Sequence, residues 1–140
     1  MINRAFLPDV AKNKALVVQF FKAIENNEFM NVFDEIVAEN YNDHLPGQRP
    51  GRGILKQYFS GLHTAFGNLK LPIWSMIAEG DQVAVYNSVQ GIHQAKYGPF
   101  SAKGNAVDVR AFQLYRIENG QLAEHWEVAD FATMVEQIRA

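Results

Sequence analysis

The chain has 140 residues, a length typical of a single domain, so we expect one domain over residues 1–140. Hydrophobic residues make up 48% and charged residues 20% of it, which excludes intrinsic disorder as the main state. The net charge of -2 gives no basic footprint and argues against a nucleic-acid partner. Because cysteine is absent, a disulfide framework, a thiolate metal site and a cysteine nucleophile are excluded.

The sequence shows no sign of a membrane or export signal. No apolar run reaches the length that a bilayer-spanning helix needs. The segment Met1–Asp9 lacks the basic start and apolar core of a signal peptide. We therefore expect a cytoplasmic protein that makes no contact with a membrane.

Apolar residues recur at helical spacing in the first half of the chain. Asp9 is the expected N-cap of the first helix, which Asn26 and Asn27 interrupt. Proline and glycine mark the long connection before the last of these helices. Helices are predicted over residues 10–25, 29–40 and 54–66, with a loop over 41–53.

The second half is typical of two β-hairpins and a short final helix. Asn119-Gly120 is the strongest two-residue hairpin signal in the chain, and Gly80-Asp81 is a second turn. Because helices come first and the sheet follows, the predicted class is α+β with an antiparallel sheet. Strands are predicted over residues 70–79, 82–93, 106–118 and 121–130, with a final helix from Phe131.

The hairpin turns also predict which side chains share a face. A two-residue turn at Asn119-Gly120 pairs Glu118 with Gln121, and then Gln113 with Trp126. This register places Gln113, Tyr115, Trp126 and Asp130 on one face and His125 and Glu127 on the other. In the first hairpin, Trp74, Asn87 and His93 share the inner face.

Both faces of each hairpin carry apolar residues. Helices covering one face and a second copy of the chain covering the other would explain that pattern. We therefore expect a homodimer that forms through the outer face of the sheet.

Asp130 is the first candidate for chemistry. It follows Trp126 by four residues on an otherwise apolar face, and a dry environment raises the pKa of a carboxyl and makes it a useful proton acceptor. The alternative is that Asp130 caps the final helix. Spacing alone favours the cap, and the two roles are compatible.

Other polar residues are weaker candidates. His93 and His44 are placed where either could donate a hydrogen bond to a developing oxyanion, although a solvated histidine at the end of an element is the commoner case. Gln113 and Asn87 are amides in the middle of strands, so they bond each other, water or a ligand. The four histidines show no close ligand spacing, so no metal site is expected.

Three segments resemble a known family. Tyr41-Asn-Asp-His44-Leu-Pro46 followed by Gly53 is similar to a Y-x-x-H-x-P…G signature. Glu79-Gly-Asp-Gln-Val-Ala-Val85 with Gly91-Ile-His93 is similar to E-G-D-x-V-A-V…G-T-H, and Arg116 to Asp130 follows R-x-x-x-G-x-I-x-E-x-W-x-x-x-D. Their order and spacing resemble the SnoaL-like polyketide cyclases, also called ester cyclases.

The resemblance implies a nuclear transport factor 2-like cone, or cystatin-like roll. In that fold N-terminal helices pack on a curved antiparallel sheet that encloses a pocket, a short helix ends the chain, and dimers form through the outer sheet face. The resemblance also implies acid–base chemistry without metal or organic cofactor on a small hydrophobic or aromatic carbonyl compound. The expected reaction is of the aldol cyclase, dehydratase or isomerase type.

The resemblance completes the expected site. Asp130 matches the family's general acid/base, with His93 and His44 as expected catalytic partners. Because no histidine lies between His93 and His125, the family's strand histidine is missing, and a non-catalytic ligand-binding or dimeric interaction module is the alternative. An epoxide hydrolase or dehydratase is a further, less favoured option. The expected substrate contacts are Trp126, Trp74, Asn87, Gln113, Tyr115, Phe59 and Tyr41, although for the two tyrosines a place in the core is the commoner case.

Overall fold

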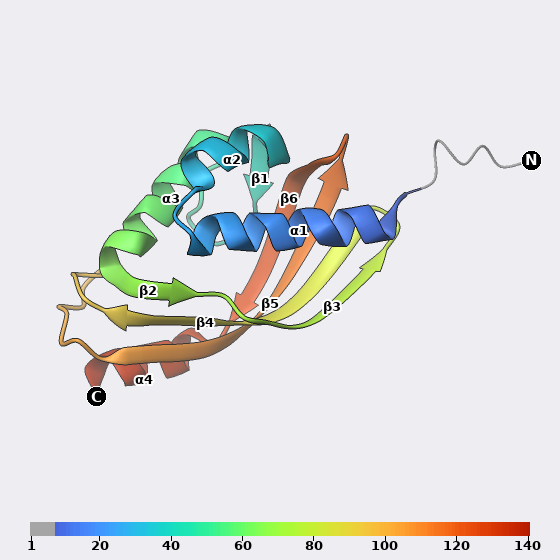
Figure 1. Cartoon of the computed structure of the whole chain (residues 1–140). Helices are drawn as coiled ribbons and strands as arrows, with labels where there is room; N and C mark the ends of the chain where they lie inside the picture. The colour runs from blue at the N-terminus through green and yellow to red at the C-terminus, as the bar shows by residue number, and fades with distance from the viewer. Residues whose placement is uncertain (1–7) are drawn as a thin grey trace, which may run out of the picture.

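The computed structural model describes residues 8–140, so the expectation about a signal peptide lies partly outside the described part. Three helices lie over one face of a curled six-stranded sheet, and a fourth follows the last strand (Figure 1). The helices are α1 (Val10–Glu25), α2 (Phe29–Ile36), α3 (Arg52–Ala65) and α4 (Phe131–Arg139). The strands are β1 (Val37–Asp43), β2 (Phe66–Lys70), β3 (Ile73–Glu79), β4 (Gln82–His93), β5 (Ala106–Glu118) and β6 (Gln121–Ala129).

The sheet runs in the order β1-β6-β5-β4-β2, and β3 also pairs with β4. It curls around α1, while α2 and α3 close its concave side (Figure 1). This arrangement confirms the predicted α+β cone. One detail of the prediction is wrong: β1 pairs with β6 in parallel, so the sheet is mixed rather than antiparallel.

Helix α1 forms where the apolar spacing predicts it. The Asp9 carboxylate caps the helix by accepting a hydrogen bond from the Lys12 amide at 3.0 Å. Its apolar stripe is buried against the sheet, and Phe20 stacks on Phe33 of α2 with ring centroids 4.8 Å apart. Burying each such side chain contributes roughly 1.5–3 kcal/mol, which is why the stripe fixes the helix on the sheet.

The prediction is confirmed over residues 44–51, which form the expected loop, and wrong over residues 37–43 and 52–53, which belong to β1 and α3. Helix α2 ends at Ile36, and the chain continues directly as β1, where a helical turn and a loop were expected. Val37, Tyr41 and Asp43 are buried in this strand. The partner strand β6 lies far away in the sequence, so no local pattern reveals the pairing.

A bulge in the last hairpin decides which side chains face the helices. Glu118 pairs with Gln121 as predicted, but the register shifts between Arg116 and Ile117, so that Gln113 pairs with Glu127 and not with Trp126. A shift of one residue moves every later side chain to the opposite face. His125 and Glu127 therefore face inward, and Trp126 faces outward.

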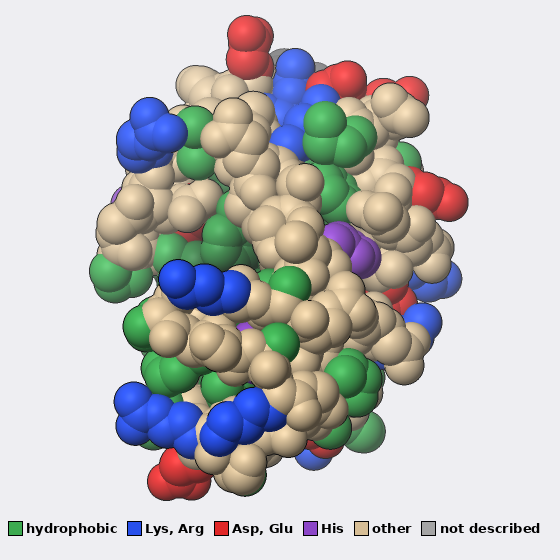
Figure 2. All heavy atoms as spheres, turned by 90° about the vertical axis from the view of Figure 1, so that its left-hand side faces the viewer, with side chains coloured by type: hydrophobic (Ala, Val, Ile, Leu, Met, Phe, Trp, Pro, Cys, Tyr) green, Lys and Arg blue, Asp and Glu red, His purple; other side chains and the backbone are tan. Residues whose placement is uncertain are grey.

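The charged surface residues do not gather into one region at the end of the molecule that Figure 2 shows. Lys and Arg side chains form separate groups there, with Asp and Glu between them and at the edges (Figure 2). Among residues 8–140, no helix is long and apolar enough to cross a membrane.

Candidate functional site

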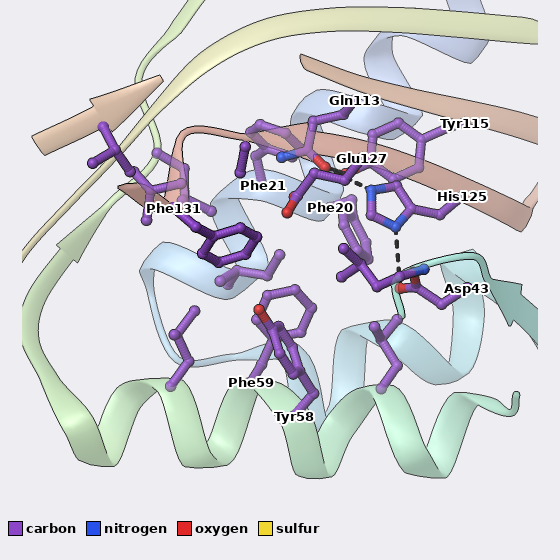
Figure 3. A pocket seen from close by; sticks show the side chains of 18 of the residues that line it. Phe20, Phe21, Asp43, Tyr58, Phe59, Gln113, Tyr115, His125, Glu127 and Phe131 are labelled. Atoms are coloured by element: carbon purple, nitrogen blue, oxygen red, sulfur yellow. Dashed lines mark hydrogen bonds and ion pairs between the residues drawn. The ribbon is translucent and has the colours of Figure 1, made fainter. Parts of the chain in front are cut away.

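A cavity lies between the concave face of the sheet and the helices (Figure 3). Its volume is about 70 Å³. One enclosed water needs roughly 10–15 Å³, so the cavity has room for about five waters. A ligand with about one ring would occupy the same space. Asp130 and Phe131 line it and are exposed, so they mark its opening. The aromatic lining residues are Phe20, Phe21, Tyr41, Tyr58, Phe59, Tyr97, Tyr115 and Phe131, and the polar ones include Asp43, Gln113, His125 and Glu127.

His125 and Asp43 form a buried pair in the cavity wall. The Nδ1 atom of His125 lies 3.1 Å from Asp43 Oδ2, although the contact is not directed as a good hydrogen bond. The other carboxylate oxygen of Asp43 accepts a hydrogen bond from the Leu45 amide at 3.0 Å. Both side chains are almost fully buried, so water does not screen the interaction between them.

A chain of amides fixes the orientation of His125. Asn87 Nδ2 donates to the Ser88 carbonyl at 3.0 Å, and Asn87 Oδ1 accepts from Gln113 Nε2 at 3.3 Å. The oxygen of Gln113 must then face His125 Nε2, 2.6 Å away. Since that oxygen only accepts, Nε2 of His125 carries a proton and donates it.

Glu127 is the carboxyl that points into the cavity (Figure 3). Burial raises its pKa above the ordinary value, and the nearby Asp43 carboxylate adds to the rise. His125 opposes the rise, and so does a hydrogen bond that the Glu127 carboxylate accepts from Gln113. A carboxyl whose pKa is shifted towards neutrality exchanges protons efficiently with a substrate.

Tyrosines surround this carboxyl. Burial raises the pKa of Tyr41, Tyr58 and Tyr115 well above the usual range, and the negative charges of Glu127 and Asp43 add to the effect. Burial and Glu127 also raise the pKa of Tyr97. Each hydroxyl therefore keeps its proton near neutral pH and serves as a hydrogen-bond donor.

The lining includes no Lys or Arg within the described residues, whereas Asp43, Glu127 and Asp130 contribute carboxylates. An anionic ligand would meet uncompensated negative charge in an apolar setting. Between residues 8 and 140, no group of three or more His, Cys, Asp or Glu side chains is placed to hold a metal ion.

The structure brings five of the ten predicted site residues to the cavity. Gln113, Tyr115, Phe59 and Tyr41 line its wall, and Asp130 lies at its opening. The five others lie elsewhere, for reasons of register and burial.

Asp130 is a helix cap. It accepts hydrogen bonds from the Thr133 amide at 3.1 Å and from the Thr133 hydroxyl at 2.7 Å. These bonds lower its pKa, so the expectation of a raised pKa is wrong and the capping alternative is confirmed. A catalytic role for Asp130 stays a prediction, and the surroundings of Glu127 suit proton transfer better.

His44 and Trp126 lie on the outer face of the sheet. The shifted register turns Trp126 outward, and the His44 ring stacks on it with centroids 4.7 Å apart. His44 Nε2 contacts Glu124 Oε2 at 2.6 Å. Their placement as cavity residues is therefore wrong.

Trp74, Asn87 and His93 also miss the cavity. The pairing of β3 with β4 is irregular between Ile73 and Ser75, and Trp74 faces outward, where its Nε1 donates to Ser88 Oγ at 2.8 Å. Asn87 lies behind the wall and orients Gln113. His93 is fully buried against Phe66, and neither ring nitrogen is bonded to any group of residues 8–140.

Five cavity residues are not among those that the sequence predicts: His125, Glu127, Asp43, Tyr58 and Tyr97. A regular hairpin would place the first two on the outer face. The sequence does contain a local sign of the bulge, because Leu122 and Ala123 are successive apolar residues where a regular strand would alternate. Both are buried in the structure. Asp43 fell in a segment expected to be a loop.

The curled sheet and the helices that close its acid-lined cavity define a cone of the nuclear transport factor 2 type. The family model for SnoaL-like polyketide cyclases matches residues 15–138. The chain therefore belongs to the SnoaL-like polyketide cyclase family, as the sequence motifs indicated.

Solved structures share the fold at low sequence identity. TsrD from Streptomyces laurentii is 20% identical, with a TM-score of 0.87 over 94% of this chain and 97% of that one. A protein from Jannaschia sp. CCS1, described as a proposed SnoaL-like polyketide cyclase, is 19% identical, with a TM-score of 0.85 over 100% of this chain and 99% of that one. IdmH from Streptomyces antibioticus, described as a proposed polyketide cyclase, is 19% identical, with a TM-score of 0.81 over 91% and 99%. No curated protein matches the chain.

Proposed function

We propose that the protein is a cofactor-independent acid–base enzyme that acts on a small apolar carbonyl compound, with Glu127 as the proton carrier. One observation carries the proposal: a carboxyl whose pKa is raised by burial points into an apolar cavity. Membership of the SnoaL-like family supports this class of chemistry.

The proposed reaction begins with proton transfer from carbon. Ionised Glu127 accepts a proton from the carbon next to the substrate carbonyl, and the electrons of the broken C–H bond form the C=C bond of an enolate. In an aldol cyclisation the enolate carbon then bonds to the carbon of a second carbonyl, whose oxygen gains the negative charge and takes up the proton. In an isomerisation the enolate is conjugated with a C=C bond, and a carbon further along takes up the proton while the double bond shifts. Glu127 returns the proton in either case.

The buried layer behind Glu127 has a supporting role in this scheme. The His125–Asp43 pair and Gln113 hold fixed dipoles and charge beside the carboxyl. Groups whose orientation is already fixed need not reorganise during proton transfer, which lowers the barrier.

Hydrogen–deuterium exchange at the carbon beside the carbonyl of cyclohexanone tests the proposal, because the ketone has one ring and exchangeable α-hydrogens. We expect the protein to speed exchange in D₂O, measured by NMR, and the variant Glu127→Gln to lose at least about 100-fold of that rate. Glu124→Gln is the matched control, since Glu124 lies on the same strand and faces outward. Equal rates in Glu127→Gln and wild type would refute the assignment.

We further propose that the outer sheet face pairs with a second copy of the chain. Trp74, Ile77, Phe112 and Val128, which we call the outer apolar patch, are 54 to 75% exposed. Phe112 pairs with Val128 across the sheet, so the patch crosses adjacent strands. Exposed apolar patches of this kind mark interaction sites.

The oligomeric state tests this pairing. We expect wild-type protein to sediment as a dimer and Val128→Glu to sediment as a monomer, because the charge would be buried in the contact. Val10→Glu, at an exposed valine on α1, is the control and should leave the dimer intact. A monomeric wild-type protein would contradict this pairing. It would also contradict the alternative that the chain is a dimeric interaction module. The cytoplasmic location stays a prediction.

A further inference from the structure

Most polar groups around the cavity bond to one another. Gln113 Oε1 accepts hydrogen bonds from His125 Nε2 at 2.6 Å and from the Tyr115 hydroxyl at 3.4 Å. Gln113 Nε2 is bonded to Asn87, and Asp43 is shared between His125 and the Leu45 amide. These groups are occupied within the wall and have little capacity left for a ligand.

Tyr58 and Tyr97 differ from them. Within residues 8–140, neither hydroxyl makes a hydrogen bond to another protein group, and neither is sealed off from the cavity they line. An unbonded hydroxyl in an apolar cavity is unfavourable unless water or a ligand accepts its hydrogen bond.

The two tyrosines come from different elements and line the same cavity as Glu127. Tyr58 lies on α3, and Tyr97 lies in the connection between β4 and β5. The rings are held edge-on, Tyr58 against Phe59 and Tyr97 against Phe66, each pair with centroids 5.1 Å apart. The Glu127 charge acts on both phenols, and Tyr97 acts on Tyr58. Figure 3 shows the Tyr58 hydroxyl and the Glu127 carboxyl both pointing into the cavity.

We propose that Tyr58 and Tyr97 donate hydrogen bonds to the carbonyl oxygen of the substrate, and that the site therefore takes an uncharged ketone or ester of about one ring. This inference rests on the proposed function and names its substrate class. Lys and Arg are absent from the described lining, and His125 is already paired with Asp43, so a carboxylate or phosphate group would lack a cation of its own and anions are disfavoured.

The donors would act where charge develops. As Glu127 takes the proton from carbon, the electron pair of the C–H bond moves to the C=C bond and the carbonyl oxygen gains negative charge. The two tyrosines keep their protons and stabilise that oxygen through stronger hydrogen bonds. When Glu127 returns its proton to carbon, the carbonyl re-forms and no other reactant is consumed.

Binding of labelled cyclohexanone tests the donors without any need for turnover. We expect the ¹³C resonance of its carbonyl to move downfield on binding, as it does when a carbonyl accepts hydrogen bonds. Tyr58→Phe and Tyr97→Phe should each reduce that shift and weaken binding by about twofold to tenfold, the range for one hydrogen bond. Tyr86→Phe is the control, because Tyr86 packs against Phe112 away from the cavity lining.

Two further ligands complete the design. Methylenecyclohexane has nearly the same shape but no acceptor oxygen, so both tyrosine variants should bind it as wild type does, which also shows that they fold. Cyclohexanecarboxylate should bind at least about tenfold more weakly than cyclohexanone, since its charge is buried without a partner.

The outcomes separate this inference from the proposed function. Loss of the carbonyl shift in the Tyr58→Phe, Tyr97→Phe double variant supports the donor pair even if Glu127→Gln leaves proton exchange unchanged. A shift that persists in the double variant overturns the donor pair, whatever Glu127 does. Tight binding of the carboxylate, or failure of both neutral ligands to bind wild-type protein, overturns the substrate class.

Discussion

The sheet carries a histidine–carboxylate pair on each face, and the two pairs differ in their surroundings. On the inner face, His125 and Asp43 lie 3.1 Å apart, with side chains 6% and 4% exposed. On the outer face, His44 and Glu124 lie 2.6 Å apart, with side chains 37% and 21% exposed. Water screens the outer pair and barely reaches the inner one. The same two types of side chain therefore interact weakly on the outer face and strongly on the inner face.

The neighbouring glutamates show the same contrast. Hydrogen bonds from Arg116 and then His44 lower the pKa of Glu124 on the outer face. Burial raises the pKa of Glu127, three residues later on the inner face. The bulge before these residues determines which face each one occupies, so it also determines which carboxyl is suited to proton transfer.

Removing one partner from each pair should give the largest difference in stability. Asp43→Ala leaves a buried imidazole without its carboxylate and should lower the free energy of unfolding by about 3–5 kcal/mol. His44→Ala removes an exposed partner and should cost about 0–1 kcal/mol. Urea denaturation of both variants measures the difference, and equal losses would show that the inner pair is as well hydrated as the outer one.

A smaller effect is expected in how stability depends on pH. The folded state holds the Glu127 proton more tightly than the unfolded state does, so this residue makes stability decline as pH rises above the ordinary value of 4.5. The decline ends above the folded-state pKa, and its slope is at most about 1.4 kcal/mol per pH unit for one proton. We expect Glu127→Gln to remove this decline.

Glu124 should act in the opposite direction. Its lowered pKa means that its contribution to stability is present above the ordinary value and is lost as pH falls. Glu124→Gln should therefore flatten only the acidic side of the profile, by a small amount because the carboxyl is solvated. Unfolding curves at several pH values test this difference. Glu127→Gln should change the profile of stability against pH above the ordinary glutamate pKa, and Glu124→Gln should change it below.

Local patterns predict much of this fold. The cap at Asp9, the helical stripe behind it, and the turn at Asn119-Gly120 depend on residues that are close in sequence. Strand β1 and the bulge after Arg116 depend on pairing between distant segments, which a period in the sequence does not encode. The site was hard to predict for the same reason: one extra residue in β6 reverses the faces of His125, Trp126 and Glu127.

Titration of individual carboxyl groups by NMR would show which of them is the proton carrier. With ¹³C-labelled glutamate and aspartate, Glu127 should titrate above the ordinary range, and Glu124 and Asp130 should titrate below it. The substitutions Glu127→Gln, Glu124→Gln and Asp130→Asn assign the three resonances. If Glu127 instead titrates at or below its ordinary value while Asp130 titrates above, the proton carrier is not Glu127 and the account of the cavity is wrong.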